Sequence, residues 1–248
     1  MAVFSFYKEF NVPEWIYILL LTLGAGLAMP LGGCLATIDA IKPNWLNEEL
    51  RHSVTAFGGG ALLSAIALVL VPEGIVPFSV AVSAGLFLAG GLLFMCIDRY
   101  LYQHKSAAGQ LIAMLSDFIP ESIALGASLA LGKGSSFLLA TLIAMQNLPE
   151  GFNAFRELRE SGRLSDKRIL WLFLLLALMG PVSALIAYFW LARFEELVAG
   201  IMLVAAGGIM YAVFQDIAPQ VKIEKHWAPP FGAVLGFVLG LVGFMMQH

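Results

Sequence analysis

Long apolar stretches separated by short polar segments run along the whole chain. A helix of about 18 or more mostly apolar residues is long enough to cross the hydrocarbon core of a bilayer. Reading the apolar windows between the polar breaks predicts eight transmembrane helices in one domain. Their expected ranges are residues 15–38, 54–71, 78–97, 109–131, 136–156, 169–190, 197–218 and 229–246.

The polar breaks have the chemistry of turns, as at Pro72-Glu73-Gly74, Gly132-Lys133-Gly134 and Ser161-Gly162-Arg163. Composition agrees with the pattern, since 60% of the 248 residues are hydrophobic and only 12% are charged. A soluble domain has about 25% charged residues. The sequence therefore predicts an all-α integral membrane protein and excludes a soluble fold. Glycines in the first, second, seventh and eighth windows indicate close helix packing.

The distribution of lysine and arginine predicts the orientation of the chain, because cytoplasmic loops retain positive charge. Only Lys8, Lys133 and Arg193 lie on the side of the two termini. We therefore expect both termini outside the cytoplasm, on the periplasmic face of a bacterial inner membrane. The other 11 of the 14 basic residues follow the odd-numbered windows: Lys42, Arg51, Arg99, Lys105, Arg156, Arg159, Arg163, Lys167, Arg168, Lys222 and Lys225.

The fourth and fifth windows contain polar residues that are costly at membrane depth and that usually face a bundle interior. The run from Asp117 to Ser122 is echoed 29 residues later by the run from Gln146 to Gly151. In each copy the outer polar residues are four apart, so they share one helix face. Four oxygen-bearing side chains are predicted to converge: Asp117, Glu121, Gln146 and Glu150.

A proline precedes the glutamate in each copy of this motif. Pro120 and Pro149 remove backbone hydrogen bonds and leave the carbonyls of Ser116 and Met145 free. Free carbonyls at membrane depth line cavities and are themselves cation ligands. A pair of kinked helices with protonated, mutually hydrogen-bonded acids is the alternative interpretation. Repeated acids at ligand spacing beside repeated prolines favour a divalent-cation site instead.

Other polar residues give weaker indications. Gln215 and Asp216, late in the seventh window, and Asp98, at the end of the third, suit an interfacial role as well as a place on an ion pathway. Hydrolase and nucleotide-binding motifs are absent from the sequence, so we expect no enzyme and no cofactor. The mixed charges of residues 156–168 are typical of a solvated helix, not of a nucleic-acid site. All histidines are expected in loops or at the terminus: His52, His104, His226 and His248.

With this doubled motif the sequence resembles the bacterial branch of the ZIP (Zrt-, Irt-like) family of divalent metal transporters. The resemblance extends to the stretch from Gly60 to Glu73, to Asp98-Arg99, and to residues 206–210 leading into Gln215-Asp216. It implies eight helices, outward termini, import into the cytoplasm and a metal site between the fourth and fifth helices.

The chain departs from the family pattern within the motif itself. Asp117-Phe118 stands where the family usually has His-Asn, and Gln146 stands where it commonly has His. Phe118 and Gly180 replace the Asn and Glu of the family's second metal position. The resemblance therefore implies one complete site, with Asn147 as a supporting group behind the ligands. Its ligands would be Asp117, Glu121, Gln146 and Glu150.

The functional hypothesis is transport of a divalent metal ion, with manganese, iron or zinc as the substrate. Carboxylate and amide ligands without imidazole or thiolate favour harder ions, so Mn(II) or Fe(II) is the leading expectation. A non-transporting metal-binding or sensor relative of the family is the alternative. The expected partners are the metal ion and the lipid bilayer. The coupling ion, the physiological metal and a homodimeric state are left open.

Overall fold

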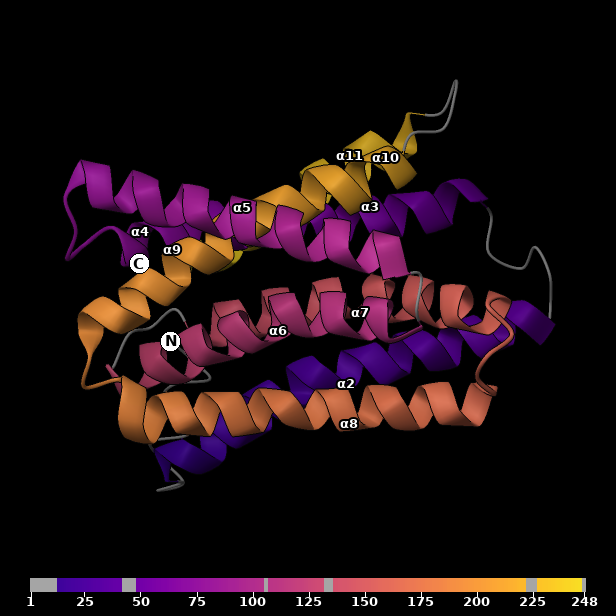
Figure 1. The fold of residues 1–248 in the computed structure, drawn as a ribbon, viewed down its shortest axis with the longest axis horizontal. Coiled ribbons are helices and arrows are strands. Elements are labelled where there is room, and N and C mark those ends of the chain that lie inside the picture. Colours follow the sequence, from indigo (N-terminus) through magenta and orange to yellow (C-terminus); the bar gives the residue numbers. More distant parts are fainter. Residues whose placement is uncertain (1–12, 42–47, 105–106, 132–135, 222–226, 247–248) are drawn as a thin grey trace.

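The computed structural model describes residues 13–41, 48–104, 107–131, 136–221 and 227–246, and within these ranges all regular structure is helical (Figure 1). The first half of the chain forms α2 (Glu14–Ile41), α3 (Glu48–Ala65), the π-helical turn η1 (Ile66–Leu70), α4 (Val71–Gly74), α5 (Val80–His104) and α6 (Ala107–Ala130). The second half forms α7 (Ser136–Glu160), α8 (Asp166–Ile186), η2 (Ala187–Leu191), α9 (Glu195–Ala212), η3 (Val213–Ile217), α10 (Ala218–Gln220) and α11 (Ala228–Met245).

The predicted all-helical fold is confirmed for the described residues. Among the described residues, six helical segments are long and apolar enough to cross a membrane. They are built on α2, α3, α5, α8, α9 and α11. Helices α6 and α7 also lie in predicted ranges and have 24 and 25 residues. Each of these two helices contains one copy of the polar motif.

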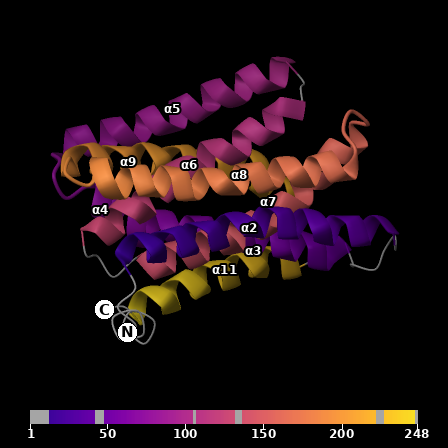
Figure 2. The ribbon, with the colours of Figure 1, turned by 90° about the horizontal axis from the view of Figure 1, so that it is seen from below.

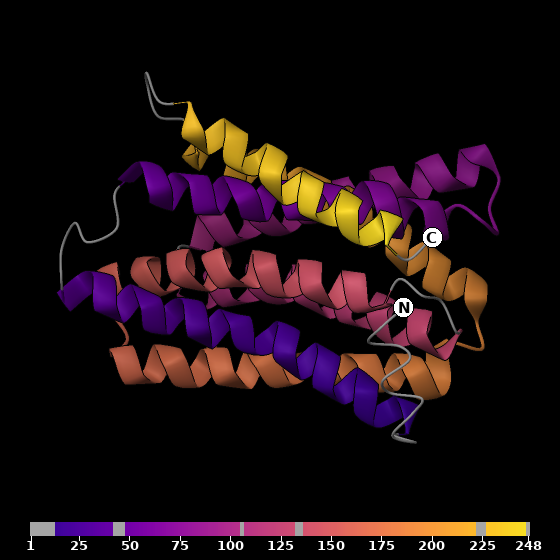
Figure 3. The same ribbon diagram turned by 180° about the vertical axis from the view of Figure 1, so that it is seen from behind.

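The long helices form two groups (Figures 1 and 3). In one group α2 packs against α7 and α8, and α6 packs against α7 and α8. In the other group α3 packs against α11, and α5 packs against α9. The groups meet where α3 contacts α7 and where α6 contacts α9. Figure 2 shows that α5 and α11 lie on opposite sides of the bundle, where much of their apolar surface is exposed.

Glycines set the closest approaches between helices. A Cβ atom at Gly60 would clash with the backbone carbonyl of Ala233, and one at Gly32 would clash with the backbone carbonyl of Leu148. Small residues let helix backbones approach in this way in lipid, where burial of apolar surface does not drive association. The contact at Gly32 holds α2 directly against the part of α7 that contains the polar motif.

Two π-helical turns precede prolines in the membrane helices. Turn η1 comes before Pro72, and turn η3 comes before Pro219. A proline lacks the N–H group needed for the regular hydrogen-bond ladder, so the preceding turn widens. Turn η3 contains Gln215 and Asp216. Turns of this kind frequently occur at functional sites.

Candidate metal site

Glu121 of α6 and Gln146 of α7 meet inside the first helix group. The Gln146 Nε2 donates a hydrogen bond of 2.6 Å to Glu121 Oε2. The Glu121 side chain is fully buried, and Gln146 is 4% exposed. Their remaining oxygens, Glu121 Oε1 and Gln146 Oε1, are buried and have no hydrogen-bond partner. Glu121 from the first copy of the motif and Gln146 from the second copy are therefore in direct contact.

The other two predicted ligands lie around this pair. Asp117 and Glu150 are half-buried, and Asp117 Oδ1 is buried without a hydrogen-bond partner. The carboxyls of Asp117, Glu121 and Glu150 are near enough to repel one another. Buried oxygens without partners and clustered like charges both raise the free energy of the folded state. A cation bound among them would remove both costs.

The four side chains do not form a finished coordination shell in this conformation. Within the residues that the structure describes, no three His, Cys, Asp or Glu side chains come close enough together to hold a metal ion. The amide group of Gln146 instead donates to Glu121, where a cation would otherwise neutralise the carboxylate. Cation binding therefore requires the amide to turn so that its oxygen faces the ion, because an amide nitrogen is not a cation ligand.

Phe118 fills the space on the other side of Glu121. Its ring is 1% exposed and lies between two glycines on neighbouring helices. A Cβ atom at Gly26 of α2 would lie 2.9 Å from Phe118 Cζ, and a Cβ at Gly180 of α8 would clash with the same ring atom. The ring therefore occupies the volume between α2 and α8 next to the site. Neither Phe118 nor Gly180 has a side-chain oxygen that could hold a cation there.

Asn147, the neighbour of Gln146 in the chain, contacts α2. Its Nδ2 donates a hydrogen bond of 3.0 Å to the backbone carbonyl of Ala25 in α2, and its side chain is 1% exposed. This bond ties α7 to α2 at the level of the motif. The side chain is therefore used in helix packing.

Asp216 is the acid on the second helix group that lies nearest to the site. Its carboxyl is exposed, yet it interacts electrostatically with Asp117 and Glu150. Ile217, the next residue, packs against Gly59 of α3, where a Cβ atom would lie 2.9 Å from Ile217 Cγ2. Gln215 is exposed as well.

Asp98, the other acid near this end of the bundle, has a partner on α9. It accepts a hydrogen bond of 3.0 Å from the hydroxyl of Tyr211. The bond joins the end of α5 to α9 and gives Asp98 a packing role. Asp98 is also near enough to Asp216 for the two carboxyls to repel each other.

The prediction that His52 and His104 lie in loops is wrong, since His104 is the last residue of α5; His226 and His248 lie outside the described residues. Helix α3 begins at Glu48, six residues before the expected start at residue 54, so His52 is helical. The error arose because the first turns of α3 are polar, and hydropathy marks the edge of the apolar core instead of the end of the helix. His52 lines a polar pocket together with Arg51, Thr55, Asn153, Arg156, Glu157 and Glu160. We did not identify this pocket from the sequence.

Comparison of the sequence with profiles of known protein families gives no match, and comparison with characterised proteins gives none either.

Proposed function

We propose that the protein is a membrane carrier that moves a divalent cation into the cytoplasm, with eight spans formed by the six apolar helical segments together with α6 and α7. The observation that carries the proposal is the set of buried, unpartnered oxygens on Asp117, Glu121 and Gln146 in the middle of two packed helices. Ionisable groups at such a depth are rare and are usually functional. Their cargo would be a divalent ion held by carboxylate and amide oxygens.

Helices α6 and α7 suit a membrane environment despite the polar motif that each contains. Glu121, Gln146 and Asn147 are buried against other helices, so they would not face lipid. The cost of a polar residue in a membrane helix falls when the residue faces the bundle interior. This arrangement supports counting both helices as spans.

The division into two helix groups supports alternating access. The Asp117–Glu150 site belongs to the group of α2, α6, α7 and α8, while Asp216 belongs to the other group. Rocking of one group against the other would expose a midplane site first to one side of the membrane and then to the other. Asp216 would then meet the ion on the cytoplasmic side.

The resemblance to ZIP transporters supports the same class of cargo. A non-transporting metal-binding or sensor relative is the alternative, since several family ligands are changed. Uptake of a panel of Mn²⁺, Fe²⁺, Zn²⁺ and Mg²⁺ into sealed vesicles that contain the purified protein tests the proposal. Uptake above that of protein-free vesicles is the expected result. Saturable binding to the purified protein without uptake would favour the sensor.

We expect a cysteine at Ser165 to react only from the cytoplasmic side. The loop between α7 and α8, which contains Ser165, lies at the same end of the bundle as the start of α3 and the end of α5 (Figure 1). The basic residues that predict the orientation include Arg51 in the first turn of α3 and Arg99 near the end of α5. Cys34 and Cys96 are exposed free thiols, so Ser165→Cys is introduced into a protein in which both are replaced by alanine. Labelling this protein in intact cells with an impermeant thiol reagent checks the expectation. Reaction without permeabilisation would show that the orientation is reversed.

We expect one cation per chain at the site. Phe118 fills the space beside Glu121, and neither Phe118 nor Gly180 has a side-chain oxygen. Anomalous diffraction from crystals grown with Mn²⁺ counts the bound ions directly. Two fully occupied ions bridged by Glu121 and Glu150 would contradict the expectation.

A further inference from the structure

One face of α7 has a continuous row of polar side chains that begins at the candidate metal site. The row consists of Gln146, Glu150, Asn153, Glu157 and Glu160, spaced by four, three, four and three residues. This spacing keeps all five on one side of a helix. The row runs from the middle of the bundle to the end of α7, so oxygen-bearing side chains follow one another along a single surface.

Helix α3 covers this row. A Cβ atom at Gly58 would lie 2.9 Å from Pro149 Cγ and 3.7 Å from the Cα atom of Gln146. One turn further along, Asn153 Nδ2 donates a hydrogen bond of 3.2 Å to Thr55 Oγ1. The two helices therefore close over the row between Glu150 and Glu157. The hydrogen bond between the neutral side chains of Asn153 and Thr55 crosses the interface at that level.

Beyond this hydrogen bond the interface opens into a polar pocket. The pocket has a volume of about 360 Å³ and includes Glu157 and Glu160 from the α7 row. A divalent ion with six waters, at about 30 Å³ for each water, needs about 180 Å³. The pocket thus has room for a hydrated cation. Glu157 also interacts electrostatically with Asp216 of the second helix group.

Arg51, His52 and Arg156 line the same pocket. The Arg156 guanidinium carbon lies 5.9 Å from the centre of the Phe152 ring, and this contact holds Arg156 at the pocket wall. Two arginines balance the two glutamates in formal charge. The carboxylates can contact a cation, but the pocket as a whole is not strongly negative. This suits release, because a site on a conduction path must bind weakly enough to let the ion leave.

We propose that this pocket is the release vestibule of the carrier: a cation that leaves Glu150 passes the Asn153–Thr55 contact, regains its water, and is held loosely by Glu157 and Glu160 before it enters the cytoplasm. The proposal rests on the proposed transport function and adds a defined exit to it. The hydrogen bond between Asn153 and Thr55 is the part that must open.

Changing the sign of the charge at position 157 tests the vestibule proposal. Cys34 and Cys96 are exposed free thiols, so both are first replaced by alanine to give a parent protein. The Glu157→Cys substitution is then added, and the purified protein is modified with either trimethylammonium-ethyl or sulfonatoethyl methanethiosulfonate. After reconstitution into vesicles, Mn²⁺ uptake should be about tenfold slower with the positive adduct than with the negative one, because a fixed positive charge repels the cation in the vestibule.

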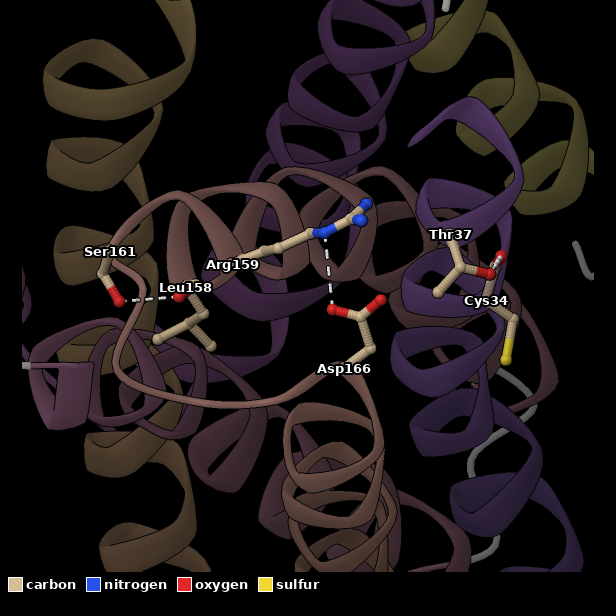
Figure 4. Close-up of polar contacts among 6 residues, drawn as sticks. All are labelled: Cys34, Thr37, Leu158, Arg159, Ser161 and Asp166. Atoms are coloured by element: carbon tan, nitrogen blue, oxygen red, sulfur yellow. Dashed lines mark hydrogen bonds and ion pairs between the residues drawn. The ribbon is translucent and has the colours of Figure 1, made fainter. Parts of the chain in front are cut away.

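Arg159→Cys is the matched control. Arg159 is on the same helix but outside the row, and its Nε lies 3.4 Å from Asp166 Oδ1 at the start of α8 (Figure 4). The Arg159 side chain is 42% exposed, so an adduct there is screened by water. The two adducts at this position should give uptake rates within about twofold of each other.

The outcomes separate the two proposals. Equal uptake with both adducts on the Glu157→Cys protein, when the parent protein transports Mn²⁺, would overturn the vestibule alone. Absence of Mn²⁺ uptake by the parent protein would overturn the transport function and the vestibule with it. Stabilisation of the protein by Mn²⁺, measured by thermal unfolding, should be the same with both adducts, since the metal site lies further along the row.

Discussion

Replacement of Glu121 by glutamine is expected to lower the initial rate of Mn²⁺ uptake by about 100-fold or more. Loss of a group that only orients a metal ligand typically lowers metal affinity or activity by about 10–100-fold. Loss of a ligand itself should cost at least as much as the upper end of that range. Glu121 is fully buried and has one unpartnered oxygen, Oε1, at the centre of the site. The substitution removes one of three carboxylates from the proposed ligand set. Uptake into sealed vesicles measures the loss.

The same substitution should leave the fold intact. Glutamine has nearly the volume of glutamate and can still accept a hydrogen bond from Gln146 through its amide oxygen. It also removes a buried ionisable group, which is often neutral or favourable for stability. We therefore expect the melting temperature without metal to be unchanged or higher. Loss of uptake from misfolding would instead appear as a lower melting temperature.

Thermal unfolding with added Mn²⁺ provides the second measurement. A ligand at 100 times its Kd stabilises the folded state by about 2.7 kcal/mol. The unmodified protein should gain this stability, and the Glu121→Gln protein should gain little at the same concentration. Glu195→Gln, at an exposed acid in the first turn of α9, is the control and should retain both uptake and stabilisation. Full uptake by the Glu121→Gln protein would remove Glu121 from the ligand set.

The positions of the helices could be predicted from the sequence because burial in lipid requires long apolar windows. Their ends could not. Helix α3 begins at Glu48 and α7 continues to Glu160, both beyond the apolar windows. Glutamate and arginine are good helix formers, so a helix continues into water where the apolar window stops. The pocket at the α3–α7 interface is built from these extensions, and hydropathy therefore gave no sign of it.

The spacing of the repeated motif indicated which side chains of one helix share a face, but not which atoms meet across helices. Gln146 contacts Glu121, whereas Asn147, one residue later, reaches the carbonyl of Ala25 on α2. Adjacent residues point about 100° apart around a helix, so they face different neighbours. Which neighbour each one meets depends on helix packing, and here that depends on close contacts such as that of Gly32 with α7.

Phe118 and Gly180 appeared in the sequence as two separate departures from the family pattern. The structure places them in contact, since the Phe118 ring lies against Gly180. A large side chain on α6 is accommodated by the absence of one on α8. The relation between the two positions could not be predicted from a single sequence, because they are 62 residues apart and on different helices.

Replacement of Asp117 by histidine should raise the ratio of zinc uptake to manganese uptake by about tenfold, which corresponds to about 1.4 kcal/mol. Imidazole suits zinc, whereas carboxylates suit manganese and magnesium. Asp117 Oδ1 is buried without a hydrogen-bond partner, and the side chain begins the four-residue spacing that ends at Glu121. A new imidazole nitrogen at this position would therefore join the ligand set.

Charge contributes to the same change. Three carboxylates around one divalent ion leave a net negative site, which is costly where the dielectric constant is low. A neutral histidine lowers the negative charge of the site by one and also weakens the repulsion between position 117 and Asp216. Asp117→Asn removes the same charge without adding an imidazole, so it separates the two effects. The Asp117→Asn substitution should lower uptake of both metals and leave the ratio of zinc to manganese uptake within about threefold of the original value.

Competition between Zn²⁺ and Mn²⁺ for uptake into vesicles, measured with both ions present, gives the ratio without dependence on protein amount. Asp216→His is the positional control, because it introduces the same side chain at an exposed acid outside the ligand set. Most protein sites bind zinc more tightly than manganese, so the absolute ratio of zinc to manganese uptake is not informative. Only the change in that ratio on substitution reports on position 117. An unchanged or lower ratio in the Asp117→His protein would show that Asp117 does not set the metal preference. A ratio raised equally by Asp216→His would assign the effect to charge near the pathway instead of to coordination.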